Sequence, residues 1–228
     1  MEKYFEIDIV FYGVSLDSMI RPDIDQFRQK IPPKVRLVVA TKYYDIEDLE
    51  TLLKHNICDF GENRVDSFLR KYAYFEGRAI KWHFIGHLQR NKCAKVINKI
   101  DVLHSLDSLE LAKMIQEKRE KPLDVLIEVS VNKEANKNGV YIEDLDSFVQ
   151  VILGYSKINL KGLMMMAIDG SDETSLHRQF RTLREVRDRL EKQFNIKLPE
   201  LSMGMSHDYK IAIEEGATMV RLGHIIGA

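Results

Sequence analysis

The chain of 228 residues carries 34 lysines and arginines against 35 aspartates and glutamates, which gives a formal net charge of −1. A nearly neutral protein has no global field that would draw it to nucleic acid or to an anionic membrane. No apolar run approaches the ~20 residues that cross a bilayer, and the acidic N-terminus lacks the basic start and apolar core of a signal peptide. We therefore expect a soluble, cytoplasmic protein that binds neither membrane nor nucleic acid.

Residues 1–34 are mixed in composition, with a helix expected before Pro32 and Pro33. From Val35 onward, short apolar runs alternate with amphipathic segments. The predicted strands cover residues 35–40, 57–60, 81–85, 101–104, 124–131, 160–165, 200–202 and 218–222. The predicted helices cover residues 45–55, 64–74, 88–99, 108–119, 142–153, 173–194 and 208–215.

This strict alternation of strands and helices predicts a parallel sheet. Eight such units in a chain of this length favour a (β/α)8 barrel, the TIM barrel, over an open doubly wound sheet. The first strand is followed by no glycine-rich dinucleotide fingerprint, which weakens the open-sheet alternative further. Since no linker divides the chain, we expect residues 1–228 to form one α/β domain, with 1–34 packed on the barrel as a helical segment.

The first predicted strand leads into Lys42, and Asp45 is placed to cap the helix that follows. In parallel α/β folds the chemistry is carried out where strands end and helices begin. A lysine amine that is partly removed from water at such a position can attack a carbonyl carbon. The competing interpretation is a lysine whose charged end simply extends into solvent.

Small and polar residues also follow the other strands. They include Gly61-Glu62-Asn63, Gly86-His87, Ser105, Asn132, Met164-Met165-Met166, Ser202 to Ser206 and Arg221 to His224. Phosphate groups are commonly bound in barrels by the loops after the seventh and eighth strands. Here Gly204, Ser206 and Gly223 let backbone amides approach an anion, beside the start of the helix at 208–215. A lysine and a phosphate cup suggest either pyridoxal 5′-phosphate (PLP) or the sugar-phosphate substrate of a Schiff-base aldolase.

Five segments resemble the pyridoxal 5′-phosphate homeostasis protein family in order and spacing. They are Ala40-Thr41-Lys42, Phe60-Gly61-Glu62-Asn63, Trp82 to Lys92, Leu201 to Asp208 and Val220-Arg221-Leu222-Gly223. The resemblance implies a single barrel similar to the N-terminal domain of alanine racemase. It also implies that Lys42 holds PLP as a Schiff base and that the protein acts in intracellular PLP homeostasis with little or no catalysis.

Transferred position by position, the resemblance places Asn63 beside the cofactor ring and Arg221 at its pyridine nitrogen. The expected phosphate-binding residues are Met205, Ser206, Gly223 and His224, the last where the family usually has a small hydroxyl residue. A charged arginine disfavours protonation of the ring nitrogen and makes the ring a poor electron sink. The alternative is a PLP-dependent amino-acid racemase or a related enzyme, which needs an acid or base opposite Lys42. Whether the protein is an enzyme therefore stays open, with a non-catalytic carrier preferred.

Other residues give weaker indications. His83 and His87 straddle a strand end without a third ligand, so no metal site is predicted. Glu62 is either a general base or a structural acceptor. Arg36 and Glu128 are predicted to form an ion pair inside the barrel. The expected partners are PLP and PLP-dependent apoenzymes that receive it, and the chain is expected to be a monomer.

The predicted helix at 173–194 carries arginines at three-residue spacing, which raises the alternative of an RNA-binding stripe. They are Arg178, Arg181, Arg184 and Arg187. We expect instead a solvated face on which Arg184 pairs with Asp188 and Arg187 with Glu191, four residues apart.

Overall fold

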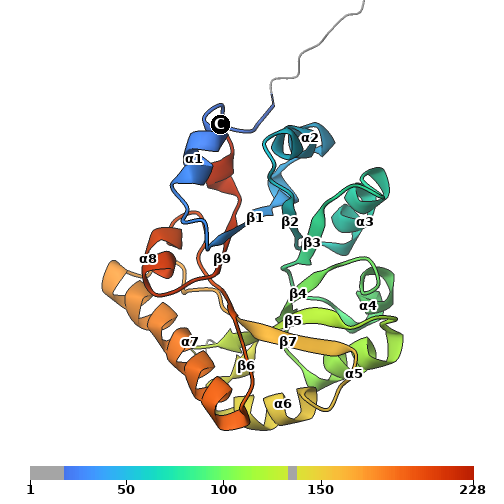
Figure 1. Ribbon diagram of the computed structural model, residues 1–228, viewed down its shortest axis with the longest axis vertical. Helices are drawn as coiled ribbons and strands as arrows, with labels where there is room; N and C mark the ends of the chain where they lie inside the picture. The colour runs from blue at the N-terminus through green and yellow to red at the C-terminus, as the bar shows by residue number, and fades with distance from the viewer. Residues whose placement is uncertain (1–17, 133–137) are drawn as a thin grey trace, which may run out of the picture.

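The computed structural model describes residues 18–132 and 138–228, and Figure 1 shows its parallel strands surrounded by helices. Every strand pairing among these residues is parallel, in the order β4-β3-β2-β1-β9-β8-β7-β5, and a further pairing of β4 with β5 closes the ring. The strands are β1 Arg36–Ala40, β2 Asp59–Glu62, β3 Lys81–Phe84, β4 Val102–Leu106, β5 Leu123–Ser130, β7 Ile158–Met164, β8 Glu200–Ser202 and β9 Met219–Leu222. The predicted eight-stranded barrel is confirmed.

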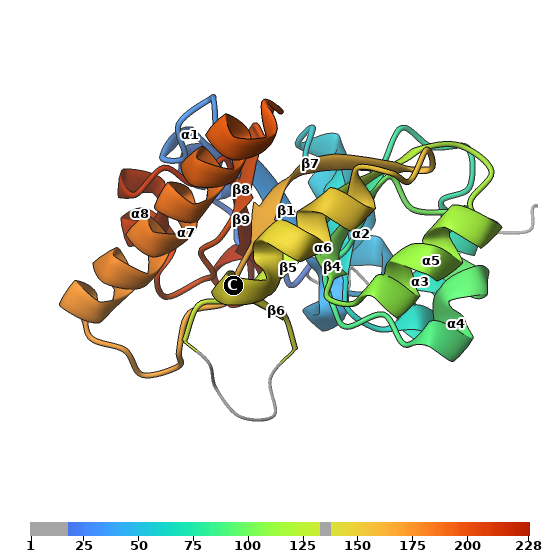
Figure 2. The ribbon, with the colours of Figure 1, turned by 90° about the horizontal axis from the view of Figure 1, so that it is seen from below.

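The helices form an outer layer, seen from the side in Figure 2. They are α1 Ile24–Gln29, α2 Ile46–Lys54, α3 Val65–Tyr74, α4 Arg90–Val96, α5 Leu109–Lys118, α6 Leu145–Ile152, α7 Glu173–Phe194 and α8 Tyr209–Glu214. Asp45 precedes α2 as predicted, and its backbone N–H donates to the Asp48 carboxylate at 3.1 Å. Within the described ranges, no helix combines the length and the apolar character that a membrane span requires.

One short strand escapes sequence analysis. β6, Val140–Tyr141, pairs with β5 outside the ring and leads into the 3₁₀ helix η2, Ile142–Asp144. Two residues are too few to produce an alternating pattern, so no sequence signal marks this strand.

The two ends of the described chain lie side by side (Figure 1). Ile20 and Gly227 form an antiparallel bridge, and the N–H of Ala228 donates to the carbonyl of Met19 at 2.8 Å. Helix α1 contacts α8 through the rings of Phe27 and Tyr209, whose centroids lie 6.2 Å apart. Part of the predicted N-terminal segment, residues 1–17, lies outside the described residues.

The barrel interior is mixed in character. The main apolar core packs between helices and strands, whereas Leu126, Met164 and Met219 form a separate buried cluster contributed by β5, β7 and β9. Beside this small cluster the interior holds polar side chains, among them His83 and His104, both 0% exposed. Buried polar groups need hydrogen-bond partners, so this interior constrains side-chain positions tightly.

The arginines of α7 have different partners from those predicted. Arg181 and Arg184 reach the carboxylate of Glu215, at 2.7 and 3.1 Å, because α7 packs along α8. Arg187 pairs with the adjacent Asp188. The prediction of pairs four residues apart is therefore wrong. The Arg181 hydrogen bond, despite the opposing effect of burial, lowers the pKa of Glu215 to about 2.

Candidate functional site

A cavity of about 470 Å³ opens at the carboxyl ends of the strands. Small-molecule sites occupy roughly 300–1,000 Å³, so this cavity suits a single small ligand. All seven residues predicted from the sequence line it: Lys42, Asn63, Met205, Ser206, Arg221, Gly223 and His224. They come from the ends of four different strands, so the barrel closure brings them together.

Lys42 lies in the short 3₁₀ helix η1, Thr41–Tyr43, directly after β1. The expectation that it is partly removed from water is wrong, because its side chain is exposed at the cavity. Its Nζ lies 4.6 Å from the centre of the Tyr43 ring, and the His224 ring lies 4.4 Å from the same ring. Tyr43 was missed by sequence reasoning, although it follows the lysine directly.

The backbone before Lys42 is held by a buried ion pair. Lys71 donates to the carbonyl oxygen of Thr41 at 2.6 Å and to the carboxylate of Glu62 at 2.5 Å. The same carboxylate accepts hydrogen bonds from the Thr41 hydroxyl at 2.8 Å, from Ser67 and from the N–H of Asn63. Glu62 is therefore a structural acceptor, and it fixes the start of η1 relative to the end of β2.

Asn63 carries an unusual atom. Among the described residues its Oδ1 is the only buried side-chain nitrogen or oxygen that lacks a hydrogen-bond partner. A buried polar atom without a partner costs about 1–3 kcal/mol, so such atoms are rare unless a ligand or water satisfies them. Because Asn63 lines the cavity, this oxygen is suited to a ligand that donates a hydrogen bond.

Backbone donors gather where phosphate binding was predicted. The N–H groups of Ser206, Gly223 and His224 form no hydrogen bond with the described part of the chain. Gly204 shapes this loop, since its φ of +95° and a Cβ position only 2.6 Å from the Ala212 Cβ exclude other residues. These free donors can hold an anion.

The predicted contribution of the helix at 208–215 is smaller than expected. Helix α8 has only six residues, and the carboxylate of Asp208 at its start already accepts the N–H of Met205 at 2.5 Å. Anion binding at this place therefore depends on loop N–H groups rather than on a helix dipole.

Gly223 packs closely against the ring of Tyr43. A Cβ at this position would lie 2.7 Å from Cε2 of Tyr43, which is far inside the contact distance. The absence of a side chain also keeps the Gly223 N–H accessible from the cavity that it lines. A larger residue at this position would therefore displace the exposed Tyr43 ring beside the anion cup.

Arg221 and Glu128 are the buried charged groups of the cavity wall. Burial lowers the pKa of Arg221 to about 10, which leaves the guanidinium protonated at neutral pH. Burial, followed by the nearby charge of Asp107, raises the pKa of Glu128 to about 7. The cavity therefore combines a fixed cation with a carboxyl group that titrates near neutrality.

The predicted Arg36–Glu128 pair is wrong. Arg36 is the first residue of β1 and lies at the amino end of the barrel, where it pairs with Asp59 at 3.6 Å and Glu200 at 3.8 Å. Glu128 lies further along its own strand, where the nearby arginine is Arg221. Parity with Lys42 suggested that Arg36 faces inward, and the apolar run around Glu128 suggested the same for that residue. Neither pattern gives the depth of a residue along the barrel.

His83 lies within β3 and His87 follows it, and the two side chains occupy different parts of the barrel. His83 lies inside the barrel, whereas His87 lines the cavity and contacts Asp107 at 2.8 Å. Across residues 18–132 and 138–228, no three histidine, cysteine, aspartate or glutamate side chains are grouped so that they could hold a metal ion.

Known proteins resemble this chain over most of its length. The family model "Alanine racemase, N-terminal domain" matches residues 14–227. A pyridoxal phosphate homeostasis protein of Aquifex aeolicus is 40% identical over 194 residues, covering 84% of this chain and 85% of that protein. A protein of the same name from Schizosaccharomyces pombe is 32% identical over 220 residues, covering 92% of each.

Solved structures agree with these sequence matches. PipY of Synechococcus elongatus with PLP bound has a TM-score of 0.81 at 27% identity, and the match covers 90% of this chain and all of PipY. Alanine racemase of Corynebacterium glutamicum, at 14% identity and a TM-score of 0.73, shares the fold over 58% of its own length. The chain belongs to the pyridoxal phosphate homeostasis proteins, whose barrel is that of the alanine racemase N-terminal domain.

Proposed function

We propose that this protein binds PLP in the cavity at the barrel mouth, holds it as a Schiff base on Lys42, and acts in intracellular PLP homeostasis. The names of its relatives and the PLP bound to PipY support the cofactor. A free aldehyde reacts indiscriminately with amines, so a protein that carries it as a reversible imine limits that damage.

The observation that supports the proposal most directly is the set of groups that line one cavity. It contains an exposed lysine amine, unpaired backbone N–H groups around Ser206 and Gly223, and the buried, unpartnered Oδ1 of Asn63. In PLP, the aldehyde can react with the lysine amine, the phosphate can accept from the backbone N–H groups, and the ring hydroxyl can donate to the Oδ1 of Asn63. A phosphorylated aldehyde or ketone matches both the amine and the anion cup.

The residues then divide the work. Lys42 would hold the cofactor through its aldehyde group, because its exposed amine lines the cavity. Asn63 would contact the ring, and Arg221 would donate a hydrogen bond to the ring nitrogen, which disfavours its protonation. When bound, PLP supplies electron withdrawal from the imine, which this arginine weakens. The phosphate would be held by the free N–H groups of Ser206, Gly223 and His224. Met205 lines the same part of the cavity, but its own N–H is bound to Asp208.

A second candidate function is a PLP-dependent racemase or related enzyme, and Glu128 favours it. A carboxyl group with a pKa of about 7 in the cavity is a competent acid or base near neutral pH. Incubation of the PLP-loaded protein with alanine in D₂O tests this function. Exchange of the α-proton that disappears in Glu128→Gln supports catalysis, and no exchange above that of free PLP supports the carrier.

The covalent site is tested by visible absorption before and after borohydride reduction, followed by peptide mass mapping. We expect a yellow protein that bleaches and carries one phosphopyridoxyl group on Lys42. Lys42→Ala should lose the adduct and keep the fold, while Lys210→Ala, which removes an exposed lysine of α8, should keep both. A colourless protein that takes up no added PLP would contradict the proposal and favour the aldolase.

We also propose that the protein works in the cytoplasm as a monomer and hands PLP to PLP-dependent apoenzymes. Light scattering on the purified protein measures its mass. Transfer is measured as the gain of activity of an apoenzyme mixed with PLP-loaded protein. A transfer rate equal to the rate of spontaneous PLP release would show that no direct handover takes place.

A further inference from the structure

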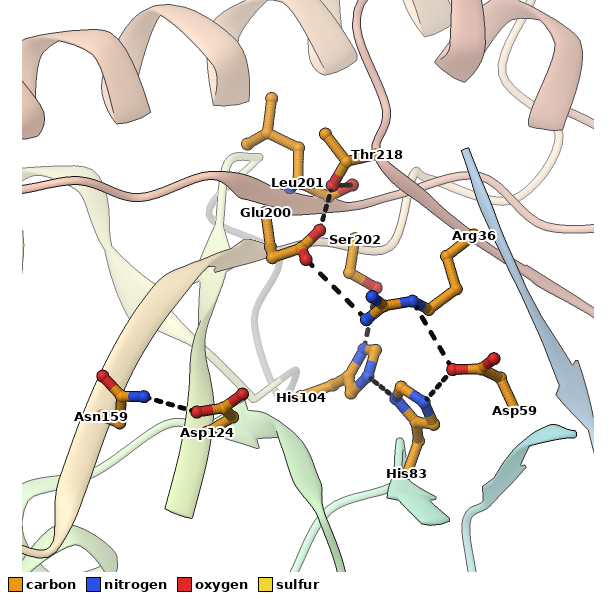
Figure 3. A network of polar contacts seen from close by, with 10 residues as sticks. All are labelled: Arg36, Asp59, His83, His104, Asp124, Asn159, Glu200, Leu201, Ser202 and Thr218. Atoms are coloured by element: carbon orange, nitrogen blue, oxygen red, sulfur yellow. Dashed lines mark hydrogen bonds and ion pairs between the residues drawn. The ribbon is translucent and has the colours of Figure 1, made fainter. Parts of the chain in front are cut away.

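A continuous chain of hydrogen bonds crosses the barrel from the cavity wall to the opposite end. Nη1 of Arg221 lies 2.7 Å from Oγ of Ser202, which lies 2.9 Å from Nδ1 of His104. Nε2 of His104 lies 2.8 Å from Nδ1 of His83, whose Nε2 lies 2.9 Å from Oδ1 of Asp59. Figure 3 shows the part of this chain from Ser202 to Asp59.

The three middle members are sealed from solvent. Ser202, His104 and His83 are each 0% exposed, and they lie on three different strands, β8, β4 and β3. The far end at Asp59 is partly open, with a side chain 22% exposed that also pairs with Arg36. Water therefore cannot replace a missing partner within the chain, and each buried group depends on its neighbour.

The protons in this chain have one consistent arrangement. An arginine only donates, an ionised aspartate only accepts, and a neutral imidazole has one donor nitrogen and one acceptor nitrogen. Burial lowers the pKa of both His83 and His104, so both rings are neutral at pH 7. Ser202 then donates to His104, His104 donates to His83, and His83 donates to Asp59, with the ring proton on Nε2 in each histidine.

The opposite direction fails at both ends. It would set the bare Nε2 of His83 against the carboxylate of Asp59, which has no proton to offer. It would also leave the hydroxyl proton of Ser202 without an acceptor in this chain. Asp59 thus determines, through two rings, that the Ser202 oxygen presents its lone pairs to Arg221.

The guanidinium of Arg221 is held on two sides by these contacts. Nη1 donates to the Ser202 carbonyl and hydroxyl oxygens, and Nη2 donates to the Met165 carbonyl at 2.9 Å. Two of its five N–H groups, on Nε and Nη2, have no acceptor among the described residues. Arg221 also lines the cavity, so these are the groups available to a ligand.

We propose that Ser202, His104 and His83 are positioning residues, which hold the Arg221 guanidinium in one orientation so that a free N–H points at the ring nitrogen of bound PLP. This inference rests on the proposed function. It assigns a role to the polar interior that the cavity alone does not explain. The barrel core then acts as a support that extends from Asp59 to the ligand.

The test compares PLP with 1-deazapyridoxal 5′-phosphate, in which a C–H group replaces the ring nitrogen. Ser202→Ala should weaken PLP binding by about tenfold, which corresponds to about 1.4 kcal/mol and lies within the range for one typical hydrogen bond. The affinity for the analogue should change by less than about twofold, because it has no acceptor for Arg221. Ser202→Thr, which restores the hydroxyl, should restore the preference for PLP.

A merely structural role gives a different result. If Ser202→Ala weakens both compounds equally, so that the ratio of affinities is unchanged, the positioning role is overturned. A wild-type protein that binds neither compound refutes the proposed function itself, and the two failures are thereby distinguished.

The direction of the chain is tested without any ligand. Long-range ¹H–¹⁵N correlation spectra should show the Nε2–H tautomer for His83 and His104 at pH 7. Asp59→Asn can donate as well as accept at the same size, so it should allow both directions and produce mixed tautomers. A protonated Nδ1 on either ring of the wild-type protein overturns the inference.

Discussion

Glu128 provides a direct check on the electrostatics of the cavity. Burial raises its pKa from an ordinary value of 4.5 to about 7, so between these values the folded protein keeps a proton that the unfolded chain releases. Stability of the ligand-free protein therefore falls as pH rises through this range. At about 1.4 kcal/mol per pH unit, the loss amounts to ~3 kcal/mol above pH 7.

Glu128→Gln mimics the protonated form at every pH and removes this loss. Urea unfolding of wild-type and variant proteins without PLP, at pH 4.5 and pH 8 and fixed ionic strength, gives the free energies of unfolding. We expect the variant to gain ~3 kcal/mol relative to wild type between the two pH values. Glu117→Gln removes an exposed carboxyl group and controls for the change in net charge.

The quantity compared is the change with pH in the stability difference between variant and wild type. The contributions of groups that titrate alike in both proteins cancel in this quantity. If the stability gap between Glu128→Gln and wild type does not change with pH, the carboxyl group is not desolvated as the structure indicates. If the gap moves in the opposite direction, Glu128 is stabilised as an anion by Arg221, and the reasoning from burial is wrong.

Three further substitutions test the buried contacts of the barrel and the phosphate-binding residues. Lys71→Met leaves the carboxylate of Glu62 buried without its cation and should destabilise the fold by about 3–5 kcal/mol in urea unfolding; a loss below about 1 kcal/mol would show that the pair is dispensable. Gly162→Ala places a Cβ 1.8 Å from the carbonyl oxygen of Glu200, so expression of folded protein, followed by circular dichroism, should collapse. Ser206→Ala should weaken binding of PLP far more than binding of pyridoxal, and equal weakening would sink the assignment of the phosphate cup.

The sequence predicts what depends on order along the chain. Strand ends follow from apolar runs and their breaks, and parallel strands bring their carboxyl ends together, so Lys42, Asn63 and Ser206 could be placed at one cavity. The family motifs then favour PLP over a sugar phosphate as the ligand. Local patterns were sufficient for these assignments because each residue lies within a few positions of a strand end.

Contacts across the barrel could not be predicted in this way. Strand patterns suggested that Arg36 and Glu128 face inward, but the tilt and stagger of the strands decide which inward residues lie at the same level. The hydrogen bond between His104 and Ser202 joins residues 98 positions apart on strands that are not neighbours. No spacing along the chain encodes such a partner.

The pairing of β1 with both β2 and β9 also orders events during synthesis. The first strand leaves the ribosome early, but one of its edges has no partner until β9, Met219–Leu222, has been made. An open strand edge in a growing chain invites pairing with other chains. Because Arg221 lies on β9, the ring and the cavity are completed together, so a nascent chain is not expected to capture its ligand before the barrel has closed.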